Sequence, residues 1–304
     1  MNRQLKIVEH AKYYWAVSII IILLGAIFLI ANGGFAEDIE FAGGLSMTVD
    51  MGEQAKTVDL DEIASLVKEV APDVGEPVIQ RSDDNQIVIQ TVTVENDVRD
   101  AIQNKILEKY SLEPSAILSA DNISATVGGE LKAQALQATG IAALLMLLYI
   151  SIRFEFKTGV AAIVALLHDC AIMLSFYAIF RVPINTTFIA AILTIIGYSI
   201  NNSIVVFDRI RENYKKSRRA PFNETVNNSV KQTLTRSINT TITTLLPVVM
   251  LLIFGVSSIR TFTIPLIVGL LAGTYSSVLL AAPVWAWLKR WQDGWKKRKR
   301  SKTA

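Results

Sequence analysis

The side chains of this sequence that could do chemistry lie within its most apolar stretches. Asn201 and Asn202 are adjacent in the run TIIGYSINNSIVVFDRIREN at 194–213, Asp169 interrupts a second apolar run, and Arg236 precedes a third. A carboxyl group can load and release a proton, whereas an amide can bind an ion or water but cannot change its charge. Polar groups in apolar helices are candidates for an ion pathway, so we regard these four residues as ion-coupling candidates.

The spacing of the polar residues predicts two polar helix faces. Side chains three, four or seven positions apart lie on one side of a helix. The first face would hold Thr194, Tyr198, Asn201 and Asp208, with Asn202 at its margin, and the second Arg236, Thr240, Thr243 and Pro247. We expect these faces to point inward, toward other helices, where polar side chains cost least.

Simpler roles for the same residues stay open. Thr240 and Thr243 could merely hydrogen-bond neighbouring helices, and Arg236 could lie at the membrane boundary with its guanidinium in water. Asp169 could belong to an ion pathway, or it could be a structural partner of Arg236 or of a second subunit. Gly269 and Gly273 form the sequence GLLAG, which is typical of close helix packing.

Covalent catalysis is not indicated. The sequence shows no nucleophile and base arrangement, no phosphate-binding loop and no cluster with metal-ligand spacing, and its one cysteine, Cys170, lies in an apolar stretch. We therefore expect no catalytic residue, no metal and no cofactor.

The elements that position these residues are apolar segments of membrane-spanning length. Hydrophobic residues make up 51% of the 304-residue chain and charged residues 19%, and about 20 apolar residues cross the hydrocarbon core of a membrane. Six segments qualify: 13–31, 133–152, 159–180, 187–207, 238–256 and 262–288. The last is overlong, so we expect it to be tilted or broken near Pro283.

The charge distribution predicts the orientation of these segments. Residues 32–131 carry 20 acidic and 6 basic residues, 208–236 carry 8 basic and 3 acidic, and 289–304 carry 8 basic and one acidic. Basic flanks stay in the cytoplasm, so residues 1–12, the loop 208–236 and the tail 289–304 are expected inside. Residues 32–131 are then exported, and helices 2 to 6 occupy 132–288.

The exported segment has the pattern of one small α+β domain. Alternating strands are expected at 45–51, 75–80, 86–92 and 115–124, with an amphipathic helix at 58–70, capped by Asp59, and another at about 95–110. The order βαββαβ predicts a ferredoxin-like fold.

Two basic segments are expected at the cytoplasmic surface. Phe222, Val226, Val230 and Leu234 recur every four residues, which predicts an interfacial helix leading into the fifth membrane helix. In the tail, Trp291 and Trp295 precede a basic run, which favours an anchor on anionic membrane lipid over contact with nucleic acid.

Several motifs resemble the SecF branch of the SecD/SecF protein-export family. LTIIGYSINNSIVVFDRIREN at 193–213 resembles its fourth-helix signature. In family order, the other similar motifs are FAGG at 41–44, VGGEL at 127–131, RFEFKTGVAAIVALLHD at 153–169, QTLTRSINTTITTLLP at 232–247 and GTYSS at 273–277. A basic anchor at the start and a basic tail at the end lead us to expect that the chain is complete.

The resemblance implies the fold, partners and activity. The fold would be a membrane all-α bundle of six transmembrane helices, half of an RND-type transporter, with one small extracytoplasmic ferredoxin-like domain. The chain would lie in the bacterial cytoplasmic membrane, pair with SecD, and associate with the SecYEG translocon and an insertase. It would use an ion gradient to promote the movement of translocating polypeptide chains. Half of a small-molecule or lipid transporter, or a passive scaffold for the translocon, are the alternatives.

Asn202 departs from the family signature, in which this position is usually an aspartate that carries a proton beside the arginine matched here by Arg236. An amide cannot fill that role. Three explanations stay open: SecD supplies the only titrating acid, which we favour; Asp169 takes over; or the protein couples to another cation or only weakly.

Overall fold

The computed structural model describes residues 6–82, 85–153, 155–217, 220–255 and 257–300. The chain divides into two compact units. One is a helical unit of residues 1–36, 139–182 and 187–304, and the other is a small unit of residues 37–138 and 183–186.

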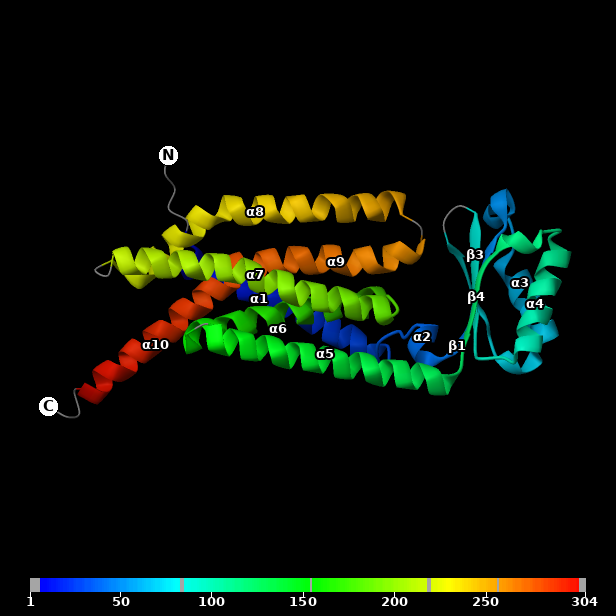
Figure 1. The fold of residues 1–304 in the computed structure, drawn as a ribbon, viewed down its shortest axis with the longest axis horizontal. Coiled ribbons are helices and arrows are strands. Elements are labelled where there is room, and N and C mark those ends of the chain that lie inside the picture. The colour runs from blue at the N-terminus through cyan, green and yellow to red at the C-terminus, as the bar shows by residue number, and fades with distance from the viewer. Residues whose placement is uncertain (1–5, 83–84, 154, 218–219, 256, 301–304) are drawn as a thin grey trace. The chain divides into compact units, whose positions relative to one another are not determined.

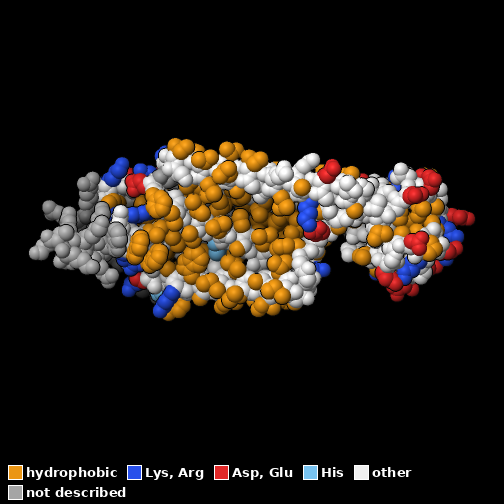
Figure 2. Space-filling view, turned by 90° about the horizontal axis from the view of Figure 1, so that it is seen from below, with side chains coloured by type: hydrophobic (Ala, Val, Ile, Leu, Met, Phe, Trp, Pro, Cys, Tyr) orange, Lys and Arg blue, Asp and Glu red, His pale blue; other side chains and the backbone are white. Residues whose placement is uncertain are grey.

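Six helical spans in the described residues are long and apolar enough to cross a membrane (Figure 1). They are α1 (Ile7–Ala31), α5 (Ala125–Arg153), α6 (Phe156–Phe180), α7 (Thr186–Lys216), α8 (Phe222–Phe254) and the pair α9 (Ser257–Ser276) and α10 (Ala282–Arg300), which the π-helical turn η4 (Ser277–Ala281) joins. Hydrophobic side chains cover the middle of the bundle, and charged ones gather toward its ends (Figure 2). This is the six-helix membrane fold that the sequence predicts.

The first helix begins at Ile7, earlier than the predicted span start at 13. Ile7 and Val8 are buried, and the Val8 amide, which has no partner within the helix, donates to Asn227 Oδ1 of α8 at 3.0 Å. Asn227 Nδ2 in turn donates to Glu9 at 2.9 Å. Because α8 satisfies the end of α1 in this way, the helix extends beyond its apolar run into the basic segment.

The interfacial helix expected before the fifth span is not separate from it. Helix α7 continues to Lys216, and α8 is one helix of 33 residues. Neither glycine nor proline occurs between 222 and 246, so nothing in the sequence interrupts the helix. Val226 and Val230 are fully buried in the bundle core, so the apolar face packs on protein rather than on the membrane surface.

The irregularity in the last span lies at 277–281, just before Pro283, where the sequence predicts a tilt or a break. Proline has no N–H to donate to the carbonyl four residues earlier, which here belongs to Leu279 in the π-helical turn. The wider turn accommodates this missing bond without ending the helix.

The small unit contains a four-stranded antiparallel sheet of β1 (Gly44–Asp50), β2 (Val78–Ser82), β3 (Gln86–Thr91) and β4 (Ile117–Ile123), in the order β2-β3-β1-β4. Helices α3 (Leu60–Val70) and α4 (Asn96–Lys109) cover one face (Figure 1). Leu45, Met47 and Val49 alternate along β1 and are fully buried in the core. This order and strand direction are those of the expected ferredoxin-like fold.

The predicted cap of the first domain helix is present. Asp59 has an extended backbone and accepts a hydrogen bond from the Asp61 amide at 3.0 Å, so it satisfies one of the free N–H groups at the start of α3. The buried face of this helix includes Ile63 and Val67, both fully buried.

Candidate functional site

Asp169 lies at the centre of a buried hydrogen-bond network in the helical unit. Its side chain on α6 is 0% exposed. His168 Nδ1 lies 2.9 Å from Asp169 Oδ1, and the hydroxyls of Ser199 on α7 and Ser276 on α9 donate to Oδ2, the latter at 2.8 Å. A carboxyl group buried among helices is tolerated when such donors surround it.

The network extends to α1. His168 Nε2 lies 2.8 Å from Ser18 Oγ on α1, and that hydroxyl donates to the Tyr14 carbonyl at 3.2 Å. Both ring nitrogens of His168 are thus hydrogen-bonded, which lowers the cost of burying the imidazole in an apolar bundle.

Close helix approach brings the network together. A Cβ atom on Gly269 would lie 2.4 Å from Ile195 Cγ1, and one on Gly273 would lie 3.3 Å from Ser199 Cβ and 3.6 Å from Asp169 Oδ2. The GLLAG segment of α9 therefore lies against α7 beside the buried carboxyl.

The two predicted polar faces point outward, which corrects the expectation that they line the interior of the bundle. Thr194, Asn201, Arg236 and Thr243 are exposed in this chain. Asn202, predicted at the margin, is instead buried at 3% exposure. Helical spacing groups residues correctly on one face, but it does not say whether that face meets the same chain, another chain or lipid.

Arg236 is not the partner of Asp169 in the described structure, because His168, Ser199 and Ser276 provide the hydrogen bonds to that carboxyl. Arg236 lies on the outer face of α8, where its carbonyl accepts a hydrogen bond from Thr240. The pairing considered from the sequence is therefore wrong for this chain.

Within the described residues, Thr240 and Thr243 do not hydrogen-bond neighbouring helices, so the simpler role considered for them from the sequence is wrong. Thr240 Oγ1 donates to the Arg236 carbonyl at 2.9 Å, and Thr243 Oγ1 donates to the Asn239 carbonyl at 3.0 Å. Each bond runs to the preceding turn of the same helix. The hydroxyls are thus satisfied locally, and the face that carries them is free to meet another surface.

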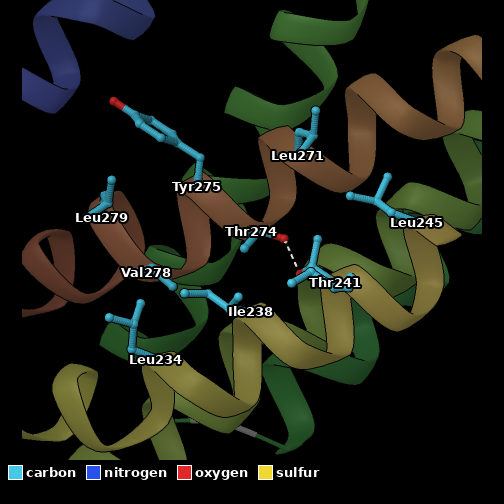
Figure 3. Close-up of a pocket in the computed structure, with 10 residues that line it drawn as sticks. Leu234, Ile238, Thr241, Leu245, Leu271, Thr274, Tyr275, Val278 and Leu279 are labelled. Atoms are coloured by element: carbon cyan, nitrogen blue, oxygen red, sulfur yellow. Dashed lines mark hydrogen bonds between the residues drawn. The ribbon is translucent and has the colours of Figure 1, made fainter. Parts of the chain in front are cut away.

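A second polar connection links α7, α8 and α9. The Tyr198 hydroxyl donates to Thr241 Oγ1 at 2.9 Å, and Thr241 Oγ1 lies 2.6 Å from Thr274 Oγ1. This threonine pair lies beside an apolar cavity of about 370 Å³ between α8 and α9 (Figure 3). Tyr275 lines the same cavity with its ring, but its hydroxyl points away and donates to the Tyr14 carbonyl of α1 at 2.8 Å.

Several buried polar atoms on α7 and α8 have no hydrogen-bond partner among the described residues. They include Asn202 Nδ2, Ser203 Oγ and Ser237 Oγ. An unpaired buried donor of this kind costs about 1–3 kcal/mol. Asn202 is thus neither a satisfied structural amide nor a group that can change charge.

Sequence reasoning missed five members of these networks: Ser18, Ser199, Thr241, Thr274 and Ser276. Serine and threonine are common in membrane helices, so their presence alone predicts little. The only usable signal is positional, because Ser276 lies three residues after Gly273 on the close-packed face of α9.

Comparison with known proteins places this geometry in a family. The sequence profile described as "Protein export membrane protein SecD/SecF, C-terminal" matches residues 102–291. The chain belongs to the SecD/SecF family. The protein translocase subunit SecF of Sebaldella termitidis is 38% identical, with 98% of this chain and 96% of that protein covered. The family assignment from the sequence motifs is thus confirmed, and the chain is a multi-pass membrane protein.

Members of the SecD/SecF family differ in length. The SecDF translocase subunit of Bacillus subtilis is 40% identical over 92% of this chain, which covers 37% of that protein. The crystal structure of SecDF from Thermus thermophilus, described as a translocon-associated membrane protein, matches with a TM-score of 0.84 and 32% identity, covering 96% of this chain and 39% of that one. This chain therefore corresponds to a little over a third of those larger proteins.

Proposed function

We propose that this chain is the SecF subunit of a bacterial protein-export complex that uses an ion gradient to promote the translocation of exported chains. Its membrane half would pair with a SecD half, and the complex would associate with the SecYEG translocon and an insertase. The basic termini would lie in the cytoplasm and the small unit outside the cytoplasmic membrane. Covalent chemistry is not required for this role.

The observation that carries the proposal is the exposed polar face of α7 and α8, formed by Thr194, Asn201, Arg236 and Thr243. Polar and charged side chains that face lipid inside a membrane are costly, and they almost always face protein or water. A second membrane half with complementary polar groups would cover this face. The SecDF relatives are more than twice as long as this chain, so they have room for such a second half in the same polypeptide.

We propose that the partner supplies the titrating acid. Asn202 cannot carry a proton, and Asp169 has each of its oxygens hydrogen-bonded within this chain while being 0% exposed. Asn201 lies on the exposed face, where it can bind an ion or water beside an acid of the partner. Asp169 and His168 would then hold α1, α6, α7 and α9 together.

The test is gradient-driven export into membrane vesicles that contain both subunits. We expect removal of the acid in the SecD membrane helices to abolish the gradient-dependent part of export, and Asn202→Asp to preserve or increase it. Asp169→Asn should reduce export only as far as it reduces the amount of assembled complex. If Asp169→Asn abolished coupling in fully assembled complex while the SecD change had no effect, the assignment of the acid to SecD would be wrong.

A further inference from the structure

Four basic side chains meet in a pocket at the end of the bundle where α6 begins and α7 ends. Lys157, Arg211, Lys215 and Lys289 line a cavity of about 130 Å³ together with Glu155, Tyr214 and Trp285. Glu155 is the one acidic residue in this lining, so the pocket carries a net charge of +3 (four cations less one carboxylate). Like charges gathered this closely repel one another unless an anion compensates them.

The acidic neighbour compensates only weakly. Arg211 Nη2 lies 3.8 Å from Glu155 Oε1, and the Glu155 side chain is 70% exposed. An exposed pair at this distance contributes little attraction. Lys157 donates to the neutral amide oxygen of Gln292. The positive charge of the pocket is therefore largely uncompensated by the described residues that line it.

Aromatic rings hold one of the cations in place. Lys289 Nζ lies 3.2 Å from the centroid of the Tyr214 ring and 3.9 Å from that of Phe222. Phe222 packs edge-on against both Tyr214 and Trp285, with ring centroids 5.4 Å and 5.7 Å apart. These rings attract the ammonium group without neutralising it, so it stays available to an anion.

The start of α6 adds to the positive potential. Helix α6 begins at Phe156, and Glu155 at its N-cap makes no side-chain capping bond. The free N–H groups of a first helical turn and the helix dipole favour an anion at this end. The basic side chains and the helix start thus both favour the binding of an anion.

From these features we infer that the pocket binds a phosphate group. Arginine and lysine together suit phosphate oxygens, arginine by its planar fork and lysine as a point charge. A cavity of about 130 Å³ has room for a phosphate group with a little water. Either the headgroup of an anionic phospholipid or a free phosphate has this chemistry. The inference does not depend on the proposed role in export.

The test uses the full chain in nanodiscs and the double variant Lys215→Gln/Lys289→Gln. The matched control is Lys6→Gln/Lys12→Gln, which removes the same charge from residues that do not line the pocket. Thermal unfolding is followed in phosphatidylcholine, with and without inorganic phosphate at constant ionic strength, and in discs containing phosphatidylglycerol. Native mass spectrometry counts retained phosphatidylglycerol molecules.

We expect phosphatidylglycerol to raise the unfolding temperature of the wild type and of the control, with one lipid molecule retained. In the double variant, the affinity for phosphatidylglycerol should fall at least about tenfold. Stabilisation by phosphatidylglycerol alone would identify a lipid headgroup, and stabilisation by inorganic phosphate as well would identify a free phosphate. The double variant without either ligand gives its own baseline, because it relieves the repulsion but also loses the contacts of Lys289 with the two rings. The inference is overturned if neither ligand stabilises the wild type, or if the double variant and the control respond alike.

Discussion

At the scale of single residues, the sequence contains two histidines with opposite environments. His168 is 4% exposed and bonded at both ring nitrogens, whereas His10 is exposed and its Nδ1 bonds the Lys6 carbonyl of its own helix. The pair provides a matched comparison for the buried network.

We predict that His168→Phe destabilises the protein by about 2–4 kcal/mol, because Asp169 and Ser18 each lose a partner while buried. The exposed His10→Phe should change stability by less than about 0.5 kcal/mol. Denaturant or thermal unfolding in the same detergent measures both. Equal effects of the two substitutions would contradict a stabilising role for the network.

The sequence could identify Asp169, Asn202 and the outward-facing residues as unusual, because their polarity conflicts with their apolar surroundings. It could not show which side of each helix packs against other helices of the same chain. Ser199 and Asn202 lie three positions apart on α7, and only the packing against α6 shows that Ser199 donates to Asp169 while the Asn202 amide nitrogen stays unpaired among the described residues.

At the scale of elements, close packing of α7 and α9 depends on Gly269. We predict that Gly269→Ala destabilises the protein by about 1–3 kcal/mol, since its methyl group would lie 2.4 Å from Ile195 Cγ1. The control is Gly197→Ala on α7, where nothing lies within 4 Å of the added Cβ. That substitution should stabilise the helix by up to about 1 kcal/mol.

Unfolding measurements on these two glycine variants, and on Gly269→Ala combined with Ile195→Ala, separate packing from helix propensity. Measured against Ile195→Ala alone, Gly269→Ala should cost less stability than it does in the wild type, because the added methyl group then has space. If both glycine variants lost the same amount of unfolding free energy, α7 and α9 would not be held together at Gly269.

The segment 183–186 belongs to the small unit and leads directly into α7. Glu40 accepts hydrogen bonds from the Thr186 amide at 2.8 Å and from its hydroxyl at 2.6 Å, and the Asp38 amide donates to the Ile184 carbonyl at 3.1 Å. Glu40 therefore satisfies the first N–H group of α7, at Thr186, which belongs to the same unit as Glu40. Sequence reasoning could not find this contact, since 146 residues separate its partners.

We predict that Glu40→Ala loosens the first turn of α7. Loss of a cap costs about 1 kcal/mol, which corresponds to about fivefold faster amide hydrogen exchange in residues 186–190. Glu53→Ala is the control, because Glu53 pairs with the exposed Lys56 alone among the residues that the structure describes. Unchanged exchange in Glu40→Ala, or an equal change in both variants, would contradict the capping role.

At the scale of the whole molecule, six spans and the βαββαβ order were predictable because hydrophobic length and alternation depend on local sequence. The continuous α8 and the early start of α1 were not, because tertiary contacts at Val226, Val230 and Asn227 determine them. The outward orientation of the polar face of α7 and α8 was not predictable for the same reason, because it depends on how the helices pack. A single chain shows which residues its own helices leave uncovered, and that surface is where a second membrane half would bind.

The most direct test of this account is cysteine cross-linking in cell membranes. With the single native cysteine replaced by Cys170→Ser, new cysteines are placed on the polar face by Asn201→Cys and Thr243→Cys, and on α5 by Leu145→Cys, a position 60% exposed in an apolar setting. We predict that positions 201 and 243 cross-link to one partner, a SecD-type membrane subunit, and that position 145 does not. Cross-linking at 145 with none at 201 and 243, or links only between copies of this chain, would contradict the account.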